Sequence, residues 1–544
     1  MDDGGQCGAS GQVRLSTTTP GRAWRRADSV GVVNESTPPR NDDATADSQS
    51  RHAGSARRLV DATTDDALGD GDATDLLARL ASREVSASEV RAAAMARAQS
   101  ANVQLNAVTH WFEGPPDTEV NVPEDAALAG IPTFIKDNEE VTGYPTTQGS
   151  RAVPDIPAPA CSPIVTSLLQ LGLNPLGATT LPEFGLTAST ESSRFGATRN
   201  PWDTDHTAGG SSGGGAAMVA AGVVPIAHAN DGGGSIRIPA SCCGLVGLKP
   251  SRGRLPMNPI KERVPVKIAA QGVLTRSVRD TALFHAEMER LRPAPGLPAI
   301  GHVSAPGVQR LRIGLCLTAS RGLPIHPETL DAVRGVGELC QALGHHVEEV
   351  GPPAGDDFAQ DFLRYWTLLA LLLHRSGAAV YGDGFDGSMV EDLTKGMSAM
   401  ALRQAAQVPG SLRRLRRMAR TPDTGFDRYD LLVSPVTGYP APPIGYLGPD
   451  VQFRDHLVRL IRFASMTPVQ NVSGEPAMSL PLGRTSQGLP IGVHFAAPFG
   501  QERRLLEVAL ELEEAAPWPV RTSAGLAPQS VAALPEDDLQ ASRA

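Results

Sequence analysis

Residues 206–250 read HTAGGSSGGGAAMVAAGVVPIAHANDGGGSIRIPASCCGLVGLKP, with two glycine-rich clusters, at 209–215 and 231–235, around a run of small apolar residues. Three glycines before a serine let the backbone take conformations that other residues avoid. Successive N–H groups then point into one concavity, which binds negative charge. If that charge is the oxygen of a carbonyl under attack, the concavity is an oxyanion hole. We therefore expect Gly232, Gly233, Gly234 and Ser235 to donate to the oxyanion, and Ser235 to be the attacking nucleophile.

A serine hydroxyl is a weak nucleophile unless a base removes its proton. His206 and His228 lie nearby in the sequence, but the GxSxG elbow of α/β-hydrolases is absent, because Ile236 and Arg237 follow Ser235. The sequence therefore disfavours a Ser-His-Asp triad and leaves a serine–lysine variant as the better hypothesis.

A candidate lysine base stands in residues 128–138, which read LAGIPTFIKDN. Lys136 ends an apolar, strand-like run that draws it toward the interior, and lysine is seldom buried without a reason. A lysine accepts a proton only when it is neutral, which requires burial or a neighbouring positive potential. The alternative is that Lys136 leaves the core and meets solvent, and the residues alone leave both interpretations open.

Five motifs follow one another along the chain: GIPTFIKDN at 130–138, GGSSGGG at 209–215, DGGGSIRIPA at 231–240, GLVGLKP at 244–250 and NVSGEPAMSLPL at 471–482. Together, in this order and at about this spacing, they resemble the amidase signature family of serine hydrolases. One glycine-rich motif would be a weak signal, whereas the set is highly specific. The resemblance covers roughly residues 59–521.

The resemblance implies a role for each matching residue. Ser235 is similar to the nucleophile that becomes acylated. Ser211, whose peptide bond with Gly210 is expected to be cis, is similar to the serine that relays the proton. Lys136 is similar to the base, which takes the proton of Ser235 through Ser211 and returns it to the leaving amine. The alternative for Ser211 and Ser212 is a plain glycine-rich turn before a helix.

Two charged residues flank the nucleophile. We expect Asp231 and Arg237 to pair and, with Gly210, to support the reacting groups without touching substrate; the alternative is two satisfied polar residues at a strand end. The family often has threonine or isoleucine after this aspartate, whereas this chain has Gly232. The glycine either loosens the oxyanion loop or admits a bulkier acyl group.

The resemblance implies an α/β fold, a single large domain with a central twisted mixed β-sheet and helices on both faces. The strand–helix–strand order of 311–317, 327–343 and 346–350 agrees with it. We also expect a strand pair over 127–136, a capping box at 86–89 that opens a helix, and a mostly helical, variable region over 352–428 near the substrate pocket. That region holds four candidate pocket aromatics, for which ordinary core packing is the alternative: Phe362, Tyr365, Trp366 and Tyr381.

The composition of the 544-residue chain predicts which segments are disordered and which partners, compartment and cofactors to expect. Residues 1–58 and 522–544 are polar and aperiodic, which predicts a disordered N-terminal extension and a disordered tail around a 59–521 domain. A net charge of −10 disfavours nucleic acid as a partner, and no apolar stretch reaches the length of a membrane span. Six cysteines show neither zinc spacing nor a disulfide framework, which fits a reducing cytoplasm. No metal or cofactor is implied, and a homodimer is left open.

The function implied by the resemblance is a metal-independent amidohydrolase. It cleaves linear or cyclic carboxylic amides, releases amine or ammonia, and is similar to bacterial amidases akin to 6-aminohexanoate-cyclic-dimer hydrolase. The alternative is the glutaminase (A) subunit of a tRNA-dependent amidotransferase, which works with partner subunits. A catalytically silent binding protein is disfavoured, because Lys136, Ser211 and Ser235 are all present.

Overall fold

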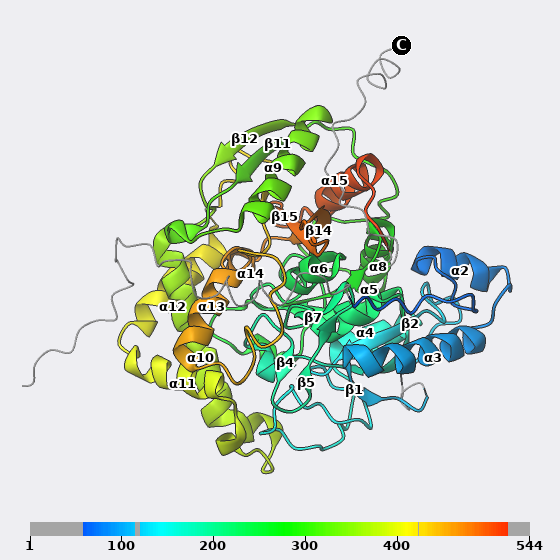
Figure 1. Ribbon diagram of the computed structural model, residues 1–544, viewed down its shortest axis with the longest axis horizontal. Coiled ribbons are helices and arrows are strands. Elements are labelled where there is room, and N and C mark those ends of the chain that lie inside the picture. The colour runs from blue at the N-terminus through cyan, green and yellow to red at the C-terminus, as the bar shows by residue number, and fades with distance from the viewer. Residues whose placement is uncertain (1–57, 115–119, 423, 521–544) are drawn as a thin grey trace, which may run out of the picture. The chain divides into compact units, whose positions relative to one another are not determined.

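The computed structural model describes residues 58–114, 120–422 and 424–520 (Figure 1). The segments predicted to be disordered, 1–58 and 522–544, lie outside these residues apart from Arg58 itself. Within the described residues, none of the helices combines the length and apolar character needed to cross a bilayer.

An eight-stranded sheet forms the centre of the fold, in the order β12-β11-β13-β15-β14-β9-β10-β8. Strand β11 pairs in parallel with β12 and β13, and the other neighbours are antiparallel. The predicted mixed sheet is therefore confirmed. The strands are β8 Ile226–Asp231, β9 Val246–Lys249, β10 Ala270–Thr275, β11 Arg312–Cys316, β12 His346–Val350, β13 Leu431–Pro435, β14 Ala477–Arg484 and β15 Pro490–Ala496.

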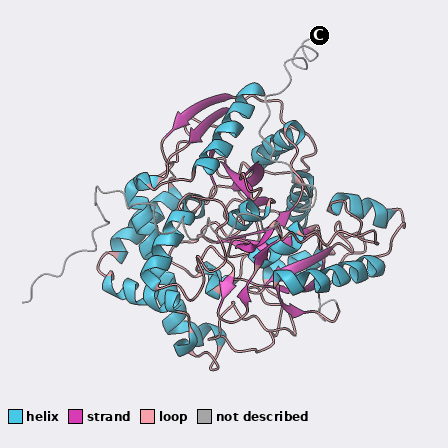
Figure 2. Ribbon diagram, viewed as in Figure 1, coloured by secondary structure: helices cyan, strands magenta, loops and turns pink. Residues whose placement is uncertain are grey.

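Helices cover both faces of this sheet (Figure 2). On β9, Val246 and Leu248 join a core cluster with side chains of α8, α9 and α15. Gly247, between them, faces α6, because a Cβ added there would lie 2.6 Å from the Cβ of Ala240. This alternation follows from the two-residue repeat of a strand, and it confirms the predicted covering on two sides. The helices are α5 Gly213–Ala220, α6 Arg237–Cys243, α8 Val278–Leu291, α9 Pro327–Ala342 and α15 Glu502–Ala515.

A second sheet of three strands, in the order β1-β3-β2, brings Lys136 to the large sheet. Thr133 Oγ1 donates to Ile226 O at 3.0 Å, and the Lys136 backbone N–H donates to His228 Nδ1 at 3.2 Å. The end of β2 is thereby fixed beside β8. The strands are β1 Val108–Trp111, β2 Pro132–Lys136 and β3 Asn174–Thr179.

The strand pair predicted over 127–136 is wrong in its first half. Only β2 is a strand, whereas residues 127–130 form turns. The reason is local geometry: the Ala129 N–H bonds back to Ala126 O at 3.1 Å, and Gly130 takes a φ of 84°.

The region 352–428 is mostly helical, as expected, and lies beside α13 (Figure 1). The capping box is also confirmed, because the Ser86 and Glu89 side chains each accept from the other's backbone N–H at the start of α3. The remaining elements are α2 Ala73–Ala81, α3 Ala87–Leu105, α4 Pro163–Gln170, η1 Glu183–Gly185, β4 Glu191–Ser192, β5 Gly196–Ala197, β6 Arg199–Asn200, β7 Asp203–Thr207, α7 Pro259–Glu262, η2 Ser320–Gly322, α10 Asp356–Tyr381, η3 Gly387–Met389, α11 Asp392–Arg403, α12 Val408–Arg420, α13 Phe453–Phe463 and α14 Pro468–Ser473.

Candidate active site

Lys136 is fully buried at the end of β2. Its Nζ donates to Ser211 Oγ at 2.8 Å, to Ser212 Oγ at 2.8 Å and to Asn230 Oδ1 at 2.9 Å. The alternative in which Lys136 leaves the core for solvent is therefore wrong. The structure brings the predicted lysine and the first serine of the pair into direct contact.

The turn that carries Ser211 is shaped by close packing around Gly210. The peptide bond between these two residues is cis, as expected. A Cβ on Gly210 would lie 2.8 Å from backbone atoms of Ala188 and Ser189, so only glycine fits. Helix α5 follows this turn directly, with Ser212 as its N-cap residue.

The two histidines considered as bases are engaged elsewhere. His228 Nδ1 accepts from the Lys136 backbone, so its Nε2 carries the proton that is donated to Gln271 Oε1 at 3.0 Å. His206 lies against Asp203, with 3.2 Å between Nδ1 and Oδ2. The histidine contacts agree with the preference for a lysine base.

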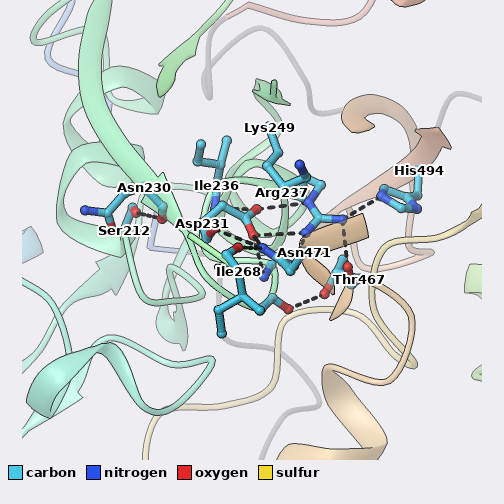
Figure 3. Close-up of polar contacts among 12 residues, drawn as sticks. Ser212, Asn230, Asp231, Ile236, Arg237, Lys249, Ile268, Thr467, Asn471 and His494 are labelled. Carbon is cyan, nitrogen blue, oxygen red and sulfur yellow. Dashed lines mark hydrogen bonds and ion pairs between the residues drawn. The ribbon is translucent and has the colours of Figure 1, made fainter. Parts of the chain in front are cut away.

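Asp231 organises the loop that ends in Ser235 (Figure 3). Its carboxylate accepts the N–H of Gly234 at 2.7 Å and the N–H of Ile236 at 3.1 Å, and it forms a two-point ion pair with Arg237 at 2.9 Å. Burial alone would raise the pKa of Asp231, but the charge and hydrogen bonds of Arg237 hold that pKa well below its usual range.

The hydrogen bond to Asp231 corrects one member of the predicted oxyanion hole. The Gly234 N–H is turned toward the carboxylate and is not available to a substrate oxygen. For the N–H groups of Gly232, Gly233 and Ser235, no acceptor is recorded among the described residues. These three remain the candidate donors.

Arg237 ties the loop to the C-terminal part of the chain, as Figure 3 shows. Its guanidinium donates to Thr467 O at 2.9 Å, to Asn471 Oδ1 at 2.7 Å and to His494 Nε2 at 3.0 Å. Burial and the charge of Arg237 lower the pKa of His494 well below its ordinary value, so the imidazole is neutral and accepts this bond.

Three residues of the site were missed from the sequence. Asn230 holds Lys136, Thr467 Oγ1 donates to Gly233 O at 2.6 Å, and Asn471 Nδ2 donates to both Asp231 O and Asp231 Oδ1. Asn230 directly precedes the nucleophile motif and Asn471 opens the last motif, so their places next to or within a motif could have indicated a role in the site. Thr467 lies outside all five motifs, and nothing in the sequence indicates its role.

Ser235 opens onto a pocket with a cavity volume of about 110 Å³. Gly210 and Gly233 also line it, and its walls are apolar side chains from α10 and α13. Phe358, Phe362 and Trp366 stack in a row, with ring centroids 6.0 and 5.5 Å apart. None of the described residues that line the pocket is an aspartate, glutamate, lysine, arginine or histidine. Elsewhere in the described residues, no group of three or more His, Cys, Asp or Glu side chains is arranged to hold a metal ion.

The four candidate pocket aromatics separate into two kinds. Phe362 and Trp366 line the pocket, and the Trp366 indole is fixed because Nε1 donates to Leu186 O at 3.1 Å. Tyr365 donates to Val266 O at 2.5 Å, and Tyr381 stacks on Phe184 with centroids 5.9 Å apart. Neither tyrosine lines the pocket, so for these two the alternative of ordinary core packing holds.

Comparison with known proteins identifies the family. The family model described as Amidase matches residues 89–506. The chain belongs to the amidase signature family. It is 47% identical over 463 residues to "Putative amidase AmiC" of Mycobacterium leprae (strain TN), covering 84% of this chain and 98% of that protein. The family resemblance drawn from the five motifs, and the amide-hydrolase activity it implied, are confirmed.

Solved structures agree with this membership. The structure of 6-aminohexanoate cyclic dimer hydrolase superposes with a TM-score of 0.72 at 30% identity, covering 84% of this amidase and 98% of that chain. A bacterial aryl acylamidase of the same family superposes with a TM-score of 0.71 at 27% identity, covering 82% and 97%. The α/β fold class is thereby confirmed as well.

A first prediction decides between the two interpretations of Gly232 in this amidase. A Cβ at this position would lie 3.8 Å from the ring of Trp366, a pocket residue, in ordinary van der Waals contact, so a larger side chain here would compete with that ring for space. Gly232→Ile is expected to lower kcat/KM for benzanilide about tenfold, since lost pocket volume of this size costs about 1–3 kcal/mol. The value for acetanilide should change little. Equal losses on both substrates would favour the loosened-loop interpretation.

A second prediction concerns Lys249, another fully buried lysine, whose Nζ donates to Pro250 O at 2.8 Å. Burial, aided by the charge of Arg237, lowers the pKa of Lys249 from 10.5 to about 7. Between these two values the unfolded chain binds a proton that the folded amidase does not, so this lysine makes stability fall as the pH drops toward 7. Lys249→Met removes this effect. Urea unfolding should therefore show that the variant gains stability relative to the wild type on going from pH 10 to pH 7, and a constant difference would contradict the assignment.

Proposed function

We propose that this amidase hydrolyses apolar, uncharged amides through a covalent acyl-enzyme on Ser235, with Ser211 as proton relay and Lys136 as base. The observation that carries the proposal is the 2.8 Å hydrogen bond between Lys136 Nζ and Ser211 Oγ, next to the pocket that Ser235 lines. Ser211 lies beside this pocket, because its neighbour Gly210 lines it and its Oγ is 3.0 Å from the place where a Cβ of Gly185, another lining residue, would stand.

Acylation begins from the neutral Lys136 amine, in which the contact with Ser211 is reversed: the nitrogen lone pair accepts the proton of Ser211, which takes the proton of Ser235. The two remaining N–H groups donate to Ser212 and Asn230. The Ser235 Oγ forms a bond to the amide carbon, and the carbonyl electrons move to oxygen. The N–H groups of Gly232, Gly233 and Ser235 stabilise that oxyanion. As the carbonyl reforms, the C–N bond breaks and the leaving nitrogen receives the proton from Lys136 through Ser211.

Deacylation uses the same residues with water as the nucleophile. Water gives its proton to Lys136 through Ser211 and attacks the ester carbon, again with the oxyanion held by the loop. The C–O bond to Ser235 then breaks, and the proton returns to its Oγ. The products are a carboxylic acid and an amine, or ammonia when the substrate is a primary amide.

The substrate class follows from the walls of the pocket. Glutamine carries an ammonium and a carboxylate, and burying such charges without ionic partners is costly. The described lining offers no charged side chain, whereas the aromatic row from Phe358 to Trp366 fits an apolar group. The pocket therefore favours a stand-alone amidase over the glutaminase subunit of an amidotransferase.

The proposed function is tested with the purified chain alone and three substrates: benzanilide, acetanilide and glutamine. Acid-quenched samples are weighed as intact protein, and the acylated peptide is sequenced by mass spectrometry. We expect a benzoyl adduct on Ser235 and release of aniline, with no ammonia from glutamine. Ammonia from glutamine without aniline release would overturn the proposal in favour of the glutaminase alternative.

A third prediction tests the aromatic wall. Trp366→Leu is expected to lower kcat/KM for benzanilide roughly tenfold, mainly through KM, because an aromatic contact of about 1–1.5 kcal/mol is lost. Tyr381→Leu is the matched control, since that ring lies in the same helix but outside the pocket. If both variants lose the same activity, the effect belongs to helix α10 and not to substrate contact.

A further inference from the structure

We propose that Glu139 is a positioning residue of the reaction, which acts through Asn230 to turn the lone pair of the neutral Lys136 amine toward Ser211. The inference rests on the proposed function, in which Lys136 is the base and Ser211 the relay. Glu139 is only 2% exposed and follows Lys136 closely in the sequence. Its backbone N–H donates to Lys136 O at 3.1 Å, so the chain turns tightly after β2.

The Glu139 carboxylate contacts two amides that face each other on neighbouring strands, Asn230 of β8 and Gln271 of β10. Its Oε1 accepts from Gln271 Nε2 at 2.8 Å and from Asn230 Nδ2 at 3.3 Å. An ionised carboxylate accepts hydrogen bonds and donates none. The orientation of a side-chain amide follows from its partners. Both amides must therefore turn their NH₂ groups toward Glu139 and their oxygens away from it.

The orientation of Asn230 decides what Lys136 meets. With its NH₂ group on Glu139, Asn230 presents Oδ1 to Lys136 Nζ at 2.9 Å. Asn138 does not fix this orientation, because it gives one hydrogen bond to Asn230 and takes one from it, at 3.2 and 2.8 Å, and a joint flip of both amides preserves the pair. A flipped Asn230 would donate to the lone pair of a neutral Lys136 and block the base. Glu139 excludes that flip.

The remaining contacts of Lys136 then direct its lone pair. A neutral amine has two N–H groups and one lone pair, and Asn230 Oδ1 takes one N–H. Ser212 Oγ donates to Asn230 O at 3.3 Å (Figure 3), so its oxygen accepts the second N–H at 2.8 Å. The lone pair is left for Ser211 Oγ, 2.8 Å away. This is the direction in which the proton of Ser211 must travel.

The other side of the same carboxylate fixes the backbone of Lys136. Gln271 Oε1, turned away from Glu139, accepts from His228 Nε2 at 3.0 Å. His228 Nδ1 accepts from the backbone N–H of Lys136 at 3.2 Å. Hydrogen bonds thus run from the backbone and from the side chain of Lys136, by two routes, to Glu139 Oε1. One buried carboxylate therefore sets the polarity of the whole ring.

Glu139 also places a negative charge behind Asn230, which favours the charged form of a nearby lysine. The other acidic groups next to Lys136 or at the end of β8 have their own partners: Asp137 accepts from Thr147, Glu140 accepts from Asn258, and Asp231 forms its ion pair. Because burial raises the pKa of Asp137 to about 7, its titration also contributes to the pH profile of the reaction. The informative readout is therefore the displacement of the profile when Glu139 is replaced.

The first experiment measures kcat for benzanilide across the acid and neutral pH range. Glu139→Gln keeps the size of the side chain but removes the charge and the strict acceptor. We expect the acid-side midpoint of kcat to fall by about one pH unit and the plateau to fall about fivefold, the equivalent of one hydrogen bond. KM should stay within about threefold, because Glu139 does not line the substrate pocket. An unchanged midpoint would overturn the proposal, because a purely structural role acts alike at every pH.

Glu475→Gln is the matched control for this substitution. The Glu475 carboxylate is also buried, but it accepts from Thr424 and Ser473 and takes no part in the ring around Lys136. Its pH profile should keep the midpoint of the wild type. An equal displacement in both variants would overturn the specific role of Glu139.

The second experiment exchanges donor and acceptor between the two residues. Asn230→Asp keeps an oxygen beside Lys136 but adds a negative charge and faces Glu139 with a second carboxylate, so the midpoint should rise by about one pH unit or more. Adding Glu139→Gln restores a donor opposite the new carboxylate. We expect kcat at neutral pH to recover about tenfold relative to Asn230→Asp alone. Absence of recovery in the double variant would overturn the coupling.

Two further observations separate this inference from the proposed function. If Ser235 is still acylated and Lys136→Met is inactive, an unchanged midpoint in Glu139→Gln overturns only the role of Glu139. If Lys136→Met remains active, the proposed function fails, and the inference fails with it. Circular dichroism verifies that each variant folds.

Discussion

Replacement of Ser235 by alanine is expected to reduce kcat for amide hydrolysis by at least about four orders of magnitude. Under the proposed function, the substitution removes the oxygen that forms the bond to the acyl carbon. The loop itself should keep its shape, because Asp231 and Thr467 hold it through the N–H of Gly234 and the carbonyl of Gly233. Initial rates of aniline release from benzanilide, measured at saturating substrate, give the loss.

A second serine of the same pocket provides the control. Ser465 lines the pocket with Ser235, and its buried Oγ has no hydrogen-bond partner among the described residues. Ser465→Ala is therefore expected to keep kcat within about threefold, because the loss of this hydroxyl breaks no contact within the protein. The benzoyl adduct should be absent from Ser235→Ala and present in Ser465→Ala. Residual turnover above one per cent in Ser235→Ala, or an adduct on another residue, would remove Ser235 from the role of nucleophile.

Local sequence predicted the parts of the site that local geometry builds. The pairing of Asp231 with Arg237 lies within one motif and was predicted from their charges, whereas the cis turn at Ser211 was implied by the family resemblance and not by its glycine content. The burial of Lys136 was the harder case. An apolar strand suggested it, and only the contact of β2 with β8 settles it.

The parts that sequence did not predict depend on contacts between distant segments. Thr467 and Asn471 contact the loop that ends in Ser235, although they lie more than 200 residues further along the chain. No periodicity in the sequence indicates such a contact. Strands β9 and β10 were also missed, because every residue of both is buried and the alternation that marks a strand is lost. The direction of the Gly234 N–H could not be predicted either, because it depends on where the Asp231 carboxylate lies.

Replacement of Lys136 by methionine is expected to lower kcat roughly a thousandfold or more, the usual scale for loss of a positioned base. Methionine has a similar length and keeps the buried volume filled, but it cannot accept the proton of Ser211. The loss should appear in kcat, while KM for benzanilide stays within about threefold, because Lys136 does not line the substrate pocket. Steady-state rates across a benzanilide series separate the two constants.

Lys249→Met distinguishes proton transfer from the general effect of removing a buried amine. Both lysines are fully buried, but only Lys136 is hydrogen-bonded to the serine pair, whereas Lys249 bonds a backbone carbonyl. If Lys136 is the base, Lys249→Met keeps kcat within a few-fold of the wild type while Lys136→Met loses it. Comparable losses in both variants would mean that buried charge supports the loop in each case and that another group accepts the proton. Because the two substitutions are chemically identical, the difference between them isolates what the contact with Ser211 contributes to catalysis.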